Sequence, residues 1–68
     1  MTIQQAIENY QNGNLAIAKK RLRRNPMETQ RVASEILGPE HGRALARWAV
    51  GGISEDELLE FSRKDVQP

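Results

Sequence analysis

Apolar side chains recur at intervals of three and four along this chain, which is the spacing of one buried face of a helix. Asparagine, glycine and proline interrupt that pattern at short intervals, where helices start and stop. The pattern predicts an all-α fold class: a single compact domain of about five short helices, one pair of which can form a helix-turn-helix. The expected helices cover residues 3–11, 15–24, 26–37, 39–50 and 55–64.

Local start signals support these boundaries. Thr2 with Gln5, and Ser54 with Glu57, have the spacing of capping boxes, in which each side chain satisfies a free backbone N–H. Asn25-Pro26 and Gly38-Pro39 place proline at the first position of a helix, where its missing N–H costs nothing. No alternating β-branched run predicts a strand. We therefore expect a helical domain over residues 1–64 and a frayed C-terminal tail over residues 65–68.

The composition excludes several kinds of site. The 68 residues include no cysteine and one histidine, so neither a disulfide nor a zinc site is expected. His41, near the start of a predicted helix, is expected to be a surface or capping side chain. Glu55, Asp56 and Glu57 suit the positive end of a helix dipole, which accounts for them without a metal or acid–base role. We expect no enzyme and no cofactor.

Targeting signals are also missing from the pattern. No apolar stretch approaches the roughly 20 residues of a membrane span, and the first residues lack a signal peptide's basic flank and apolar core. These features predict a cytoplasmic protein with no membrane partner.

Charge is distributed unevenly although the net charge is only +1. Residues 1–34 carry six basic and two acidic side chains, whereas residues 35–68 carry four basic and seven acidic ones. Most of the basic excess lies in AKKRLRRNP, residues 18–26, at the end of the second predicted helix. These cations either hold phosphates or simply solvate the negative end of a helix. Ile17 points among them and away from the predicted core; it is either a singly exposed apolar residue, which is common, or it is covered by another element or a partner.

The spacing of Gly13-Asn14, Ala18, Leu22 and Asn25 resembles that of the helix-turn-helix of many bacterial regulators. The resemblance implies a supporting helix over residues 15–22, a turn over 23–25 and a recognition helix over 26–37. It departs from the family pattern at Arg23, where such turns usually have glycine. On this interpretation the nucleic-acid-binding residues fall into two groups: phosphate contacts from Lys19, Lys20, Arg23 and Arg24, and base-edge contacts from the helix start at Thr29, Gln30 and Arg31.

A second candidate pair overlaps the first. Residues 30–48 also resemble a helix-turn-helix, with Ser34 four residues before the turn glycine, Gly38, and an outward basic pair at Arg43 and Arg47. The alternative is a pair of antiparallel or crossed helices that pack together with the arginines in solvent. The helix over residues 26–37 cannot be the recognition helix of the first pair and also the supporting helix of the second.

Two functions remain open at this point. The first is a small DNA-binding regulator of transcription, expected to be a homodimer whose protein interface uses Leu58, Leu59 and Phe61. The second is a compact helical interaction module or inhibitor, of the size common in phage and mobile elements, that binds a host protein through charged patches. An acidic fifth helix lying on the basic second helix would cancel part of the positive field and weaken the case for duplex DNA.

Overall fold

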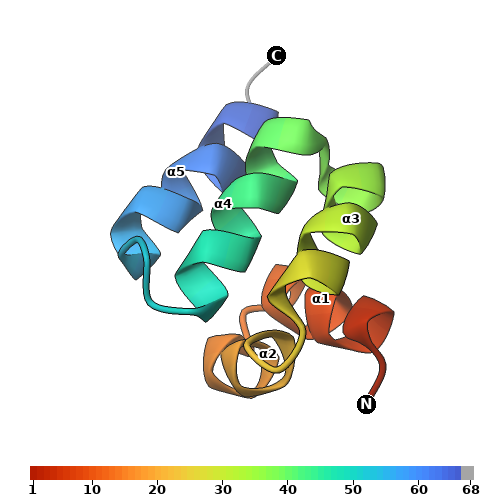
Figure 1. Ribbon diagram of the computed structural model, residues 1–68. Coiled ribbons are helices and arrows are strands. Elements are labelled where there is room, and N and C mark those ends of the chain that lie inside the picture. The colour runs from red at the N-terminus through yellow and green to blue at the C-terminus, as the bar shows by residue number, and fades with distance from the viewer. Residues whose placement is uncertain (67–68) are drawn as a thin grey trace.

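Five helices and no strand make up the described part of the chain in this computed structural model, which covers the backbone of residues 1–66 and the side chains of residues 1–63. The all-α prediction is confirmed. In chain order the helices are α1 (Ile3–Gln11), α2 (Leu15–Leu22), α3 (Pro26–Leu37), α4 (Pro39–Ala49) and α5 (Glu55–Val66) (Figure 1).

The capping box at Thr2 is complete, and Ser54 forms the N-cap hydrogen bond of the second predicted box. The Thr2 hydroxyl accepts from the Gln5 N–H at 3.1 Å while the Gln5 side chain accepts from the Thr2 N–H at 2.9 Å. The Ser54 hydroxyl accepts from the Glu57 N–H at 3.2 Å. Asn14 and Asn25, by contrast, form no side-chain cap hydrogen bond, although each precedes a helix.

Two helix ends differ from the prediction. α2 stops at Leu22, about two residues early, because Asn25 precedes a proline and takes an extended φ of −141°. α5 continues to Val66, past the expected end at Lys64, so residues 65 and 66 belong to a helix and are not part of a frayed tail. Residues 67 and 68 of that predicted tail lie outside the described residues.

α3 and α4 form the central layer. They run side by side in opposite directions and are joined by the single residue Gly38, whose φ of 100° makes the reversal possible (Figure 1). A Cβ atom on Gly42 would lie only 2.5 Å from the backbone nitrogen of Ser34, so this glycine lets the two backbones approach closely. α1 and α2 pack together across one end of this pair, and α5 packs along α4.

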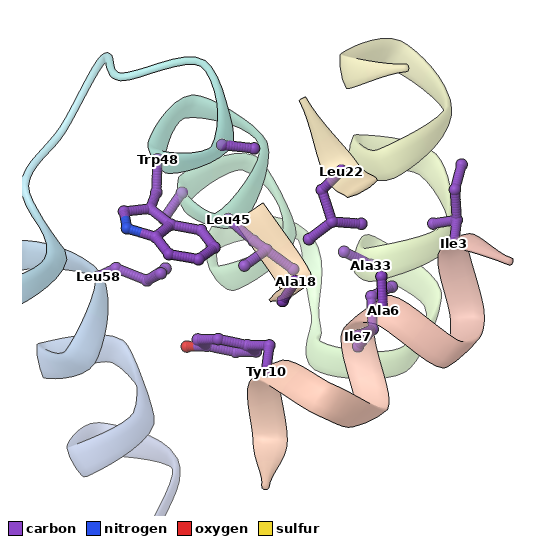
Figure 2. Packing of buried hydrophobic residues seen from close by; sticks show 12 residues of the cluster. Ile3, Ala6, Ile7, Tyr10, Ala18, Leu22, Ala33, Leu45, Trp48 and Leu58 are labelled. Atoms are coloured by element: carbon purple, nitrogen blue, oxygen red, sulfur yellow. The ribbon is translucent and has the colours of Figure 1, made fainter. Parts of the chain in front are cut away.

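The core gathers around α4. Figure 2 shows the indole of Trp48 between Leu58 and Leu45, facing the ring of Tyr10. The Tyr10 and Trp48 ring centroids are 6.0 Å apart. Alanines fill much of the remaining contact surface, which lets short helices pack closely. The buried apolar residues are Ile3, Ala6, Ile7, Tyr10, Ala18, Leu22, Ala33, Ala44, Leu45, Ala46, Trp48, Ala49 and Leu58.

The predicted dimer interface needs correction. Leu58 is completely buried inside the chain, so it is not available to a partner. Leu59 and Phe61 are partly buried and pack against the same core. The apolar face of α5 is therefore largely used within the chain, against α4.

Candidate nucleic-acid interface

The α3–α4 pair does not have the geometry of the motif it resembles. The helices of a helix-turn-helix cross at about 90–120°. α3 and α4 instead form a closely packed antiparallel hairpin, so the simpler alternative proposed for residues 30–48 describes this pair. Arg43 and Arg47 are exposed on its outer side.

α2 and α3 do meet at a steep angle, but they are not each other's main packing partners (Figure 1). α2 packs mainly on α1 and α4, and α3 packs on α4 and α1. The turn between them also lacks the left-handed residue that a turn glycine provides, since Arg23 has an ordinary helical φ of −62°. Arginine therefore occupies this position without strain, in a turn that differs from the one implied by the resemblance.

Thr29 lies in the core instead of on a recognition surface. Its side chain is 0% exposed, and its hydroxyl donates a 3.1 Å hydrogen bond to the carbonyl of Leu22, which links α3 to the end of α2. This position corrects the prediction that Thr29 meets base edges. The sequence did contain a signal, because Thr29 lies one helical turn before Ala33 on the inward face.

Arg31 is exposed but already has partners. Its guanidinium donates to the carboxylate of Glu28 and lies 3.9 Å from that of Glu35. The hydrogen bond and charge of Glu28, with a smaller contribution from Glu35, raise the pKa of Arg31. These two carboxylates make the outer face of α3 unfavourable for a phosphate backbone. Of the three predicted base-contacting residues, Gln30 alone is exposed and takes no part in these ion pairs.

The cations of α2 form a different surface, which we call the basic groove. It is a shallow depression lined by Met1, Ile17, Lys20, Arg21, Arg23 and Arg24. Among the described side chains, no carboxylate lines it, and all the ion pairs belong to Arg31 on α3. Three of the predicted phosphate contacts, Lys20, Arg23 and Arg24, are exposed here.

The other two cations of α2 are held by the protein itself. Lys19 is partly buried, with its ammonium 5.5 Å from the centre of the Trp48 ring, a cation–π contact that favours this rotamer. The Nε of Arg21 donates to the backbone carbonyl of Met1, which fixes this side chain along one wall of the groove. Its Nη1 is buried and has no hydrogen-bond partner among the described residues.

The acidic helix leaves the groove open. α5 packs against α4 and not along α2, so its carboxylates do not cover the basic groove. Ile17 stays 52% exposed in the middle of the cations, as no element of the described chain covers it. Within residues 1–66, the acidic helix therefore does not lie on the basic helix.

A buried polar cluster lies elsewhere in the molecule. The Tyr10 hydroxyl is 2.8 Å from Nε2 of His41 and 3.0 Å from the Ser62 hydroxyl, which connects α1, α4 and α5. His41 is only 5% exposed and its ring stacks on Phe61, so the expectation of a surface histidine is wrong. Sequence reasoning missed this cluster because its three members are far apart in the chain.

Comparison with known protein families, curated proteins and solved structures gives no match to this chain. Within residues 1–66, no helix combines the length and apolar character needed to cross a membrane. The described residues also contain no group of three or more side chains placed to hold a metal ion.

Proposed function

We propose that this chain is a small, non-catalytic nucleic-acid-binding protein of the cytoplasm that holds the phosphate backbone of duplex DNA in its basic groove. The observation that carries the proposal is the exposure of Lys20, Arg23 and Arg24 around a depression that, within the described part of the chain, no carboxylate lines and no helix covers. Cations placed in this way attract a polyanion over the distance of a Debye length, about 10 Å at 0.1 M salt.

The proposed mode is backbone binding with little base readout. Thr29 is buried and Arg31 is engaged with two carboxylates, which leaves Gln30 as the one predicted reader free to meet a base edge. One amide contact gives weak discrimination between sequences. Such a protein acts by covering a stretch of DNA or by changing the shape of the DNA. Sequence-specific regulation requires a further contact with the bases.

Salt dependence tests this proposal directly. Three phosphate contacts predict a slope of about −3 in a plot of log K against log salt concentration, because each neutralised phosphate releases about 0.9 of a counterion. Fluorescence anisotropy of a labelled duplex, titrated at several salt concentrations, measures the slope. In the triple variant K20A/R23A/R24A we expect the slope to fall toward zero.

The matched control is R43A/R47A, which removes exposed arginines from the outer side of α4 and leaves the groove intact. Its slope and affinity should remain those of the unchanged protein. Absence of duplex binding at low ionic strength, or an equal loss of affinity in the control, would refute the proposal.

A second candidate function is supported by the apolar residues of the same groove. Ile17 and Met1 are 52% and 56% exposed among the cations, and a phosphate backbone makes no use of them. An acidic protein segment with one apolar anchor would use both features, as in the interaction module predicted from the sequence. Ile17→Ala separates the two functions: it should leave DNA affinity unchanged, whereas it should weaken a stoichiometric protein complex.

A further inference from the structure

We propose that the basic groove also binds a second copy of this chain, through the acidic turn of that copy, in a reciprocal and salt-sensitive dimer. The acidic turn is the start of α5, with its four carboxylates at Glu55, Asp56, Glu57 and Glu60. This inference goes beyond nucleic-acid binding, and its test contains no nucleic acid.

The charges of the two surfaces are complementary. The groove presents the exposed cations Lys20, Arg23 and Arg24 beside the partly buried Arg21, and the acidic turn presents four exposed carboxylates. None of these eight groups has an ion-pair partner among the described side chains. No ion pair within the described chain therefore neutralises the groove cations, whereas Glu57 of the acidic turn lines a depression together with Arg43 and Arg47.

Chain geometry keeps the two surfaces of one molecule apart. α5 is fixed along α4 through Leu58, Leu59 and Phe61, and α2 packs on α4 and α1. The end of α4 and the connecting residues 50–54 lie between the acidic turn and α2 (Figure 1). Since neither helix can move to the other without leaving the core, their charges are satisfied more readily between molecules.

Apolar residues accompany the charges on both sides. Ile17 and Met1 lie inside the groove, and Val50, 57% exposed, ends α4 shortly before the acidic turn. Exposed ion pairs by themselves contribute little, commonly under about 1 kcal/mol each. Contact between these apolar side chains supplies the part of the attraction that salt does not screen.

The positions of the two surfaces also suit two-fold symmetry. α2 and the start of α5, which carry these surfaces, both lie toward the end of the molecule at which α4 terminates (Figure 1). A two-fold axis at this end places the groove of each copy against the acidic turn of the other, so a single interface contains both contacts. The dimer interface predicted at Leu58, Leu59 and Phe61 is thus replaced by a charged one, and DNA competes with the dimer for the same cations.

Charge reversal provides a sharp test. One variant, K20E/R23E/R24E, reverses the groove, and a second, E55K/D56K/E60K, reverses the acidic turn without changing the Glu57 of the capping box. Sedimentation velocity should show that the unchanged protein is a dimer at about 50 mM NaCl and a monomer at about 300 mM NaCl. At the higher concentration, salt screens charges within a few ångströms. Each reversed variant alone should be monomeric, with dimer affinity reduced by about tenfold or more.

An equimolar mixture of the two variants should recover the dimer, because both contacts of the mixed pair are then complementary. The control variant R43E/R47E/R63E has the same net charge as the groove variant but keeps both surfaces, so on its own it should still form the dimer at about 50 mM NaCl. Circular dichroism confirms that each variant is folded. If the turn variant unfolds, E60K alone replaces it, since Glu60 lies in the second turn of α5.

Three outcomes would overturn the inference: a monomeric unchanged protein at low salt, a mixture of reversed variants that stays monomeric, or a control variant that becomes monomeric like the groove variant. Loss of DNA binding with retention of the dimer would count against the proposed function alone. The two proposals can therefore fail separately.

Discussion

Gly42→Ala offers the most direct test of how the central hairpin is built. The added Cβ would lie 2.5 Å from the backbone nitrogen, 2.6 Å from Oγ and 2.7 Å from Cα of Ser34. Two of these three atoms belong to the backbone of α3, so rotation of a side chain cannot relieve the overlap. The helices must move apart, although one residue, Gly38, connects them.

The size of the effect follows from two opposing contributions. Overpacking of a well-packed contact costs about 1–3 kcal/mol, and the severity of this overlap places the cost at the upper end. Replacing glycine by alanine inside a helix returns about 1 kcal/mol. We therefore expect Gly42→Ala to lower the free energy of unfolding by about 1–2 kcal/mol, out of a total of about 3–10 kcal/mol for a chain of this size.

Urea unfolding followed by Trp48 fluorescence and far-UV circular dichroism measures this loss. Ala16→Gly, at an exposed position of α2, is the control for helix propensity and should cost about 1 kcal/mol. The double variant S34G/G42A should stay destabilised, because the overlap with backbone atoms remains after the hydroxyl is removed. A stability of Gly42→Ala equal to or above that of the unchanged protein would refute the close-approach argument.

The remaining predictions concern single side chains. Thr29→Val should lower the free energy of unfolding by about 1–2 kcal/mol in urea titrations, because it removes the hydroxyl bonded to the last carbonyl of α2; an unchanged midpoint would contradict the link. Tyr10→Phe should lower the free energy of unfolding by about 1–3 kcal/mol, since it removes a hydroxyl from the buried contact with His41; an unchanged free energy of unfolding would be the contrary result. Lys19→Ala should cost about 0.5–1 kcal/mol and change the emission of Trp48; identical emission spectra would argue against the stacked ammonium.

The helices and most of their boundaries could be predicted because the signals that set them are local. The capping boxes at Thr2 and Ser54 and the proline starts at Pro26 and Pro39 act within one turn of chain. The end of α2 was placed too late because cationic residues continue the helical pattern past Leu22. The effect of Pro26 on the preceding residue outweighs that pattern.

The candidate site was predictable only in part. The shared surface of Lys20, Arg23 and Arg24 was predictable, because neighbouring residues at one helix end lie on the same side of the molecule. The burial of His41 and Leu58 depends on which helices meet in three dimensions, which spacing within one helix cannot reveal. The packing of α5 on α4 is of the same kind, and it decides whether the basic groove is open.

The attachment of α5 has a consequence for the order in which the molecule opens. α4 packs against α3, α2 and α5, whereas α5 has α4 as its main packing neighbour. α5 also contacts α1 through the hydrogen bond between Tyr10 and Ser62, which are 52 residues apart in sequence. A helix with one main packing neighbour opens at a lower free energy than a core with several, so we expect α5 to open as a separate unit. Amide hydrogen exchange should therefore divide the chain into a fast unit at α5 and a slow unit centred on the α3–α4 hairpin.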